Sequence, residues 1–137
     1  MSDEYPQSAI DAIIKDRVRT FDTGANRSLE EGKLDYEGFL SPLTVERYAE
    51  YLHEHRKLPD GSVRDSDNWQ KGIPLDDYIK PAWRHFHAWW KAHRGWFKNP
   101  LTSAVDREKA LEDNVCAVIF NASGYLHELL KNKILDK

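Results

Sequence analysis

The sequence lacks the features on which several classes of protein depend. Cys116 is its only cysteine, which excludes a scaffold held together by disulfides. Its longest apolar run, residues 115–120, is far shorter than the ~20 residues that cross a bilayer, so we expect no membrane partner. The N-terminal MSDEYPQ has neither the basic start nor the apolar stretch of a secretion signal. We therefore expect a cytoplasmic protein.

A strong excess of one charge is also missing. Lys and Arg number 20, Asp and Glu number 23, and the net charge is -3, so bulk positive charge cannot hold a nucleic acid. The 137 residues are 40% hydrophobic and 12% aromatic, which is enough apolar surface for a folded core. We expect a single domain spanning residues 1–137.

Helical periodicity predominates, and no alternation typical of a strand competes with it. The pattern predicts an all-α bundle of about four helices and no sheet, with helices over residues 8–19, 42–57, 76–95 and 103–133. Ser41 and Pro42 are typical of a helix start, and Asp76 or Asp77 would begin the third helix with Pro81 in or near its first turn. Residues 1–22 form an N-terminal extension that contains the first helix. The polar segment of residues 23–40 is expected to be a loop that a partner orders.

Three of the predicted helices carry an apolar stripe that we expect to form the core. The stripes are Val45, Tyr48, Ala49 and Leu52; Ile79, Trp83, Phe86 and Trp90; and Leu111, Val115, Val118, Ile119, Ala122, Leu126 and Leu129. The last helix is too broadly apolar for one shallow contact. This breadth predicts packing on several neighbours or across a subunit interface.

Two acidic groups are candidates for a metal site. Glu46, Glu50 and Glu54 follow one another at four-residue intervals and share one quadrant of the second helix. Such like charges repel, and either solvent with Arg47 and Lys57 or a divalent metal could offset the repulsion.

Glu112 and Asp113 form the second group, on the last helix, and could complete a metal cage. They could equally be solvated charges that the helix dipole favours. Asn121 interrupts the apolar run VIFNA, where small neighbours leave room for a ligand or another backbone, and it could also bridge two helices.

The aromatic and basic segment of residues 82–98 has a composition found in nucleic-acid-binding proteins. Arg84, Lys91, Arg94 and Lys98 could contact phosphates. Because the period assigns most of the rings to the core and leaves only Trp89 and Trp96, we expect no nucleic-acid partner. The period also places Cys116 in the core, as a packing residue rather than a nucleophile.

The loops carry the cations that a phosphate substrate would need. Arg27 and Lys33 lie in the first loop, and Lys57, Arg64 and Lys71 lie in or beside the second. Trp69 could stack on a base while Asn68 binds its edge; alternatively Asn68 ends a turn and Trp69 plugs the end of the bundle.

Four segments carry a resemblance to a known family. The runs TGANRSLEEGKLDYEGFLSP, ERYAEYLHEHRKLPDGSVRDSDNWQKGIP, WRHFHAWW and LEDNVCAVIFNASGYL, within residues 23–128, resemble the phage dATP/dGTP pyrophosphohydrolases. These MazZ-like enzymes are a branch of the all-α MazG nucleotide pyrophosphohydrolases. The resemblance implies a homodimer or homotetramer that cleaves purine deoxynucleoside triphosphates, dGTP and dATP, to the monophosphate and pyrophosphate. It also implies a role in host cytoplasm, remodelling the nucleotide pool for phage DNA that contains 2-aminoadenine.

The resemblance also implies a site. Two or three Mg²⁺ or Mn²⁺ ions would be held by carboxylates, namely Glu46, Glu50, Glu54, Glu112 and Asp113. Glu50 or Glu54 would orient the attacking water, residues 23–40 would close over the substrate, and Lys71 would assist catalysis. The substrate would be bound by Arg27, Lys33, Asn68, Trp69, Lys71, Arg84 and Asn121.

This chain departs from the family's acidic motifs, which are ExxE on one helix and ExxD on a later one. The third residue after Glu50 is His53, and the third after Glu112 is Val115. The departure keeps an alternative open, in which the chain is a helical oligomer that binds a nucleotide or a partner without turnover.

Overall fold

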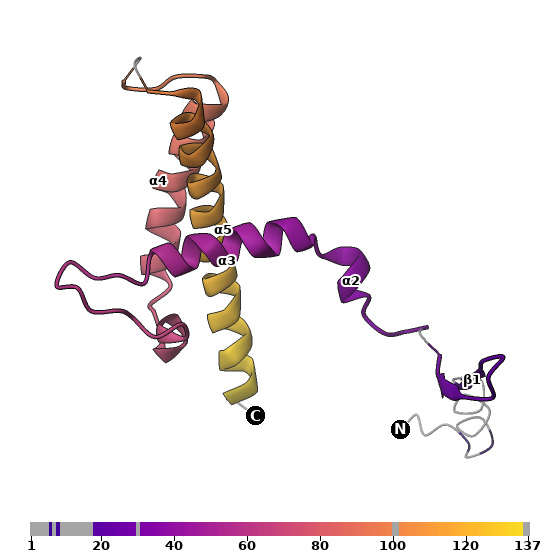
Figure 1. The fold of residues 1–137 in the computed structure, drawn as a ribbon. Coiled ribbons are helices and arrows are strands. Elements are labelled where there is room, and N and C mark those ends of the chain that lie inside the picture. Colours follow the sequence, from indigo (N-terminus) through magenta and orange to yellow (C-terminus); the bar gives the residue numbers. More distant parts are fainter. Residues whose placement is uncertain (1–5, 7, 9–17, 30, 100–101, 136–137) are drawn as a thin grey trace. The chain divides into compact units, whose positions relative to one another are not determined.

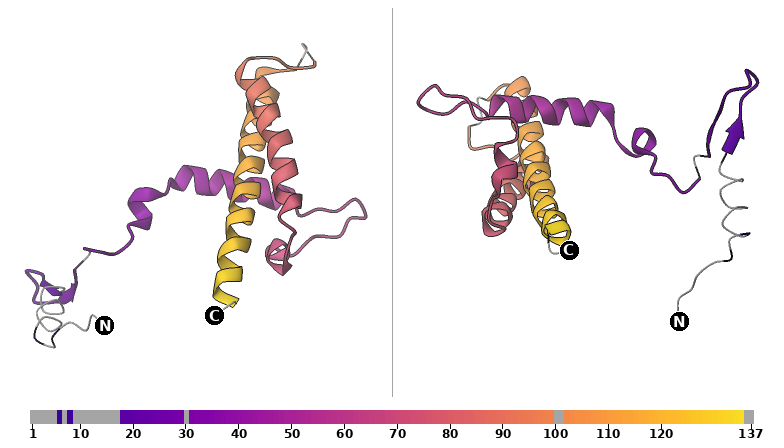
Figure 2. Two further views of the ribbon diagram at one scale, coloured as in Figure 1. Left: turned by 180° about the vertical axis from the view of Figure 1, so that it is seen from behind. Right: turned by 90° about the horizontal axis from the view of Figure 1, so that it is seen from below.

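The structure is a computed structural model that describes residues 6, 8, 18–29, 31–99 and 102–135 (Figures 1 and 2). It divides into two units, Met1–Leu40 and Ser41–Lys137. Helices predominate, as predicted. Among the described helices, none is long and apolar enough to cross a membrane.

The N-terminal unit contains a small antiparallel sheet. Strand β1 (Val18–Thr20) pairs with β2 (Asn26–Ser28), and Gly24 turns the chain between them at φ 88°. The prediction of no sheet was therefore wrong, as was the extension of the first helix to Arg19; the part of that predicted helix at residues 9–17 lies outside the described residues. The β-branched Val18 and Thr20 favour a strand, and the glycine turn supplies the partner.

One helical turn also lies within the segment that we expected to be a loop. Helix α2 (Tyr36–Phe39) is capped by Asp35, whose Oδ1 accepts a hydrogen bond from the Gly38 amide at 2.9 Å. So short an element carries no helical period, and only its cap is visible in the sequence.

In the C-terminal unit, helix α3 (Pro42–Glu54) begins where the sequence predicts. The Ser41 hydroxyl accepts a hydrogen bond from the Thr44 amide at 3.2 Å, which satisfies one of the free N–H groups of the first turn. The helix ends three residues before the predicted end at residue 57, because the chain turns back and Lys57 pairs with Val63. The short 3-10 helix η1 (Asn68–Lys71) follows.

The remaining helices, α4 (Asp76–His93) and α5 (Ala104–Leu135), run side by side in opposite directions, and α3 crosses α5 near its middle (Figures 1 and 2). The predicted start at Asp76 is confirmed. Pro81 lies in the second turn of α4, beyond the first turn where a missing N–H costs nothing.

The buried interior is formed by small and polar residues of α5. Cys116 and Ala117 pack against Tyr51 of α3, while Tyr78 of α4 is only 1% exposed and lies against Gly124. A Cβ on Gly124 would overlap the Tyr78 ring. Burial raises the pKa of the Cys116 thiol, which keeps it protonated and agrees with the packing role predicted for it.

Much of the predicted apolar stripes lies outside the buried core, which corrects the prediction, although Tyr48 and Leu52 of α3 do pack against it. Ile79, Trp83, Phe86 and Trp90 are all exposed, Trp83 by 68%, and so are Val45, Ala49, Ala122, Leu126 and Leu129. Small side chains let α4 and α5 approach closely, so the strip with Ala117 and Gly124 faces inward. Periodicity identifies an apolar face but not the molecule against which that face packs.

Candidate functional site

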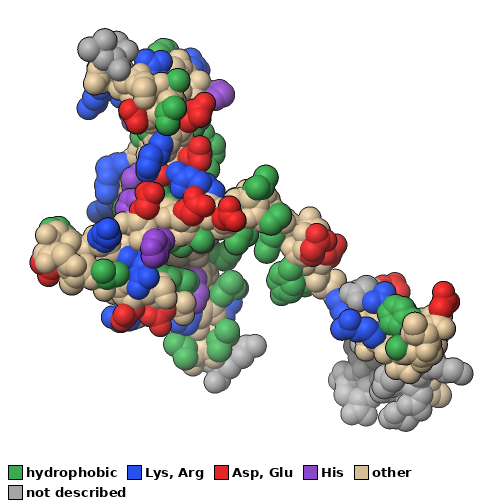
Figure 3. All heavy atoms as spheres, viewed as in Figure 1, with side chains coloured by type: hydrophobic (Ala, Val, Ile, Leu, Met, Phe, Trp, Pro, Cys, Tyr) green, Lys and Arg blue, Asp and Glu red, His purple; other side chains and the backbone are tan. Residues whose placement is uncertain are grey.

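An acidic hollow lies where α3 crosses α5. Glu50 and Glu54 of α3 and Glu108 and Glu112 of α5 line it together with Arg47, Lys109 and Val105, and its volume is about 280 Å³. Acidic and basic side chains are intermingled over this crossing (Figure 3). Two helices far apart in the sequence thus direct carboxylates toward one space.

Arg47 joins the two helices at this hollow. Its Nε donates to Glu112 Oε1 at 2.6 Å, and its Nη2 donates to Asp113 Oδ1 at 2.7 Å. The hydrogen bond to Asp113, followed by the one to Glu112, raises the pKa of the Arg47 guanidinium. The arginine that the sequence offered as a counter-ion for the α3 glutamates instead neutralises acids of α5.

Lys109 makes the complementary bridge from α5. Its Nζ donates to Asp113 Oδ2 at 2.8 Å and to Glu54 Oε2 at 3.2 Å. Burial would raise the pKa of Asp113, but hydrogen bonds from Lys109 and Arg47 outweigh that effect and lower it. Asp113 is therefore a carboxylate held ionised by two cations.

The donor set around the hollow fits a hard divalent cation, because carboxylate oxygens are the ligands that Mg²⁺ and Mn²⁺ prefer. The acids outnumber the two cations. Within the described ranges, however, no three His, Cys, Asp or Glu side chains lie close enough together to hold an ion. A metal would therefore compete with Lys109 and Arg47 for oxygens that they already bind. Glu46 is exposed and is not among the residues that line the hollow.

A second hollow lies beside the C-terminal end of α3 and has a volume of about 270 Å³. Aromatic and apolar side chains form part of its lining, namely Tyr51, Leu52, Trp69, Ile73 and Phe120, and the polar part consists of His55, Arg56, Arg64, Asp65, Ser66 and Asn68. Its size is just below the range of roughly 300–1,000 Å³ usual for small-molecule sites, so it suits one heterocycle rather than a whole nucleotide.

Local contacts hold the rings of this aromatic hollow in place. Trp69 meets His127 of α5 edge-on, with ring centroids 4.6 Å apart, and His55 lies over Tyr51 at 4.1 Å. Arg56 Nε donates to the Arg64 carbonyl at 2.8 Å, which anchors the loop. Consecutive residues at the end of α3 line different hollows, since Glu54 lines the acidic one and His55 the aromatic one.

The other predicted site residues lie apart from these hollows. Lys71 ends η1 and Arg84 lies on α4; both are exposed, and neither lines the acidic or the aromatic hollow. Asn121 is 5% exposed, and its amide donates to the Ala117 carbonyl of its own helix at 2.7 Å. Arg27 and Lys33 belong to the N-terminal unit, where Arg27 pairs with Arg19 across the sheet and Lys33 is exposed.

Several site residues went unpredicted. Lys109 could have been found from its spacing of four residues before Asp113, which is typical of a helical ion pair. Tyr51 and His55 lie four residues apart and meet locally at the end of α3, whereas only the crossing of α3 and α5 brings Phe120 to the same hollow. Comparison of the chain with family models, curated proteins and solved structures finds no match.

Proposed function

We propose that the chain is a metal-dependent pyrophosphohydrolase that cleaves purine deoxynucleoside triphosphates, dGTP and dATP, to the monophosphate and pyrophosphate. The observation that supports this most directly is that two consecutive residues of the chain, Glu54 and His55, line two unlike hollows. One hollow suits a flat ring and the other suits cations that a polyphosphate binds. A nucleoside triphosphate needs both kinds of surface next to each other.

The aromatic hollow is the proposed purine site. Trp69 and Tyr51 supply ring surfaces, and Asn68 supplies an amide that both donates to and accepts from a base edge. Arg56 and Arg64, on the same lining, would face the sugar and phosphate side. This arrangement favours recognition of a base and not of pyrophosphate alone.

The acidic hollow is the proposed metal site. Glu50, Glu54, Glu112 and Asp113 would hold Mg²⁺ or Mn²⁺, which when bound supplies Lewis-acid stabilisation of the phosphate charge and a water of lowered pKa. Among the described residues, neither Arg47 nor Lys109 forms an ion pair with Glu50, so Glu50 is a carboxylate suited to orient a water. Arg47 joins α3 to α5 beside these carboxylates through its hydrogen bonds to Glu112 and Asp113.

The exposed apolar faces support assembly into a homodimer or homotetramer. Leu126, Leu129 and Leu130 of α5 are all at least 40% exposed, and burying each side chain would contribute about 1.5–3 kcal/mol. An assembly would also bring further cations to the pyrophosphate, a role proposed for Arg27, Lys33, Lys71 and Arg84. The proposed setting is the purine nucleotide pool of a cell making 2-aminoadenine DNA.

The direct test incubates the protein with each of the four deoxynucleoside triphosphates and Mg²⁺ or Mn²⁺, followed by anion-exchange chromatography. Equal amounts of monophosphate and pyrophosphate from dGTP and dATP, and much less from dCTP and dTTP, are expected. Glu50→Gln should lose most turnover while keeping the helical circular dichroism spectrum. Glu46→Gln, the same change one turn earlier and outside the hollow, should stay near normal.

A non-catalytic nucleotide-binding oligomer is the alternative, and the ion pairs of Arg47 and Lys109 favour it because they already neutralise the acids. In that case dGTP binds but gives no product with either Mg²⁺ or Mn²⁺. If the protein is an enzyme, Asn68→Ala distinguishes the role of the aromatic hollow from that of the acidic one. This variant should raise KM for dGTP and leave kcat nearly unchanged. Equal loss of activity in Glu46→Gln and Glu50→Gln would show that the metal lies elsewhere.

A further inference from the structure

A second charged surface lies on α4, away from both hollows. Between Asp77 and Asp106 the sequence contains no acidic residue, although the whole chain has a net charge of -3. The same stretch carries five Lys or Arg, namely Lys80, Arg84, Lys91, Arg94 and Lys98. The chain as a whole is slightly acidic, but this one segment is strongly basic.

The outward side of α4 carries two parallel stripes. The aromatic and apolar stripe consists of Ile79, Trp83, Phe86 and Trp90, and the basic stripe one residue along consists of Lys80, Arg84, His87, Lys91 and Arg94. Both follow intervals of three and four residues, so each runs along one side of the helix. Trp83 and Trp90 are 68% and 52% exposed. These rings were expected in the core, and that expectation was the reason for setting nucleic acid aside.

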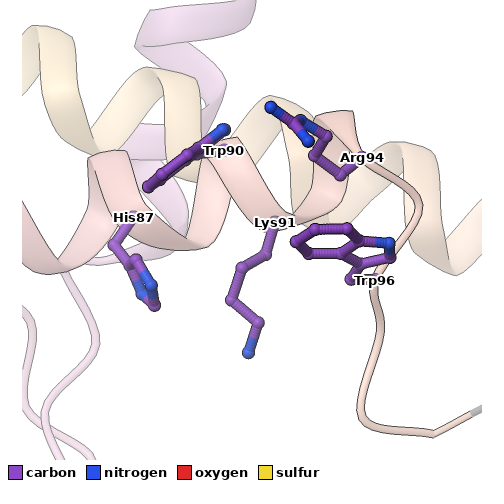
Figure 4. Close-up of a pocket in the computed structure, with 5 residues that line it drawn as sticks. All are labelled: His87, Trp90, Lys91, Arg94 and Trp96. Carbon is purple, nitrogen blue, oxygen red and sulfur yellow. The ribbon is translucent and has the colours of Figure 1, made fainter.

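The stripes end in a hollow of about 380 Å³ lined by His87, Trp90, Lys91, Arg94 and Trp96 (Figure 4). The Arg94 guanidinium lies 6.0 Å from the Trp90 ring and 5.5 Å from the Trp96 ring. Trp96 is 61% exposed. Rings and fixed cations at this spacing suit a flat base with a phosphate beside it.

A neighbouring hollow extends this surface. Lys91 and Trp96 also line a space of about 180 Å³ that includes Phe97 and Lys98. Neither lining contains an acidic residue. Two adjoining basic and aromatic hollows suit successive units of a polymer better than one small anion.

We propose that this face of α4 binds single-stranded nucleic acid. Duplex DNA keeps its bases stacked and offers no free ring faces to Trp90 and Trp96. Two copies facing each other through this surface would bring like charges together, so self-association here is disfavoured. A membrane would need a broad apolar side, whereas α4 packs its other side on α5 through Tyr78 and His85, the latter bonded to Asn114 at 3.2 Å.

The test measures fluorescence anisotropy of a labelled dT15 oligonucleotide, which has no purine and no triphosphate and so is independent of the proposed hydrolysis. Trp90→Ala with Trp96→Ala should weaken binding about tenfold or more. Trp90→Phe with Trp96→Phe should restore most of it, because a phenyl ring also stacks. Lys91→Ala with Arg94→Ala should reduce the slope of log K against log salt by about 1.4, roughly 0.7 for each phosphate contact removed, whereas Lys133→Ala on α5 should not change it.

Three outcomes would overturn the proposal. The first is that dT15 fails to bind or binds equally well to the tryptophan-to-alanine variant. The second is a dimer in light scattering that dissociates in that variant, which would make the surface a self-contact. The third is binding to phosphatidylserine vesicles without binding to dT15.

Discussion

Helix α5 is held in two places by unlike chemistry. At its crossing with α3, partly exposed ion pairs of Arg47 and Lys109 accompany a small core around Tyr51. Along α4, the contact depends on the buried Tyr78 ring against Gly124. Close packing of buried side chains tolerates little change in side-chain volume. Exposed ion pairs, in contrast, exchange readily with water and dissolved ions.

The difference teaches which part of the unit can respond to a ligand. The pair of α4 and α5 is a closely packed support, because the buried Tyr78 ring fills the space that a Cβ on Gly124 would need. The carboxylates at the α3 crossing can change partners at small cost. A cation site is therefore more easily formed at the α3 crossing than along α4.

Gly124→Val should break the rigid contact and have the largest effect. The added side chain overlaps the Tyr78 ring, and overpacking of this kind costs about 2–3 kcal/mol of unfolding free energy. Urea denaturation followed by circular dichroism measures the loss. Ser123→Val, at the exposed neighbouring position, is the matched control; equal destabilisation of both variants would contradict the packing argument.

Arg47→Met tests the charged contact and should cost less, about 1–2 kcal/mol. Methionine retains the aliphatic packing, while Asp113 and Glu112 lose a charged donor. The same denaturation experiment checks this, with Lys133→Met as a control that removes an exposed cation. A loss larger than that of Gly124→Val would reverse the ranking of the two contacts.

The charged contact should also respond to acid. Because the pKa of Asp113 is lowered in the folded protein, its carboxylate stabilises the fold above the ordinary Asp pKa of about 3.9, and that contribution disappears as pH falls through the lower folded value. The free-energy difference between the wild type and Asp113→Asn should be constant from pH 7 to 5 and shrink below about pH 4. A difference that grows in acid would mean that burial, and not the two cations, controls this carboxylate.

Lys109→Met should have the smallest effect on stability, with a shift in the denaturation midpoint smaller than that of Arg47→Met, because this ammonium is exposed on the surface. It should nevertheless tighten Mn²⁺ binding severalfold in isothermal calorimetry, since the lysine competes for Glu54 and Asp113. Weaker Mn²⁺ binding in this variant would remove the competition argument, whatever the stability result.

Local chemistry made part of the fold predictable. Ser41 and Asp76 mark helix starts that depend only on a few neighbouring residues, and both are where the sequence places them. The pairing of Val18 with Ser28 could not be predicted from helical periodicity, because a three-residue strand has too few positions to show a period of two.

The site was predictable in its residue types but not in its pairings. The acids of two helices do line one hollow, as their spacing suggested. The preference of Arg47 for Glu112 and Asp113 over the glutamates of its own helix follows from the crossing angle of α3 and α5, which no sequence pattern encodes. The outward side of α4 was predicted to be core because a sequence pattern does not show which side of a helix faces its neighbour.

The thin interior of the C-terminal unit has a thermodynamic consequence. Where Ile134 and Leu135 remain 72% exposed, each neighbouring molecule that covers such side chains adds to the free energy of folding. If the proposed homodimer or homotetramer covers these side chains, folding and association are coupled by mass action. Diluting the protein would lower its melting temperature, much as withdrawing a ligand does.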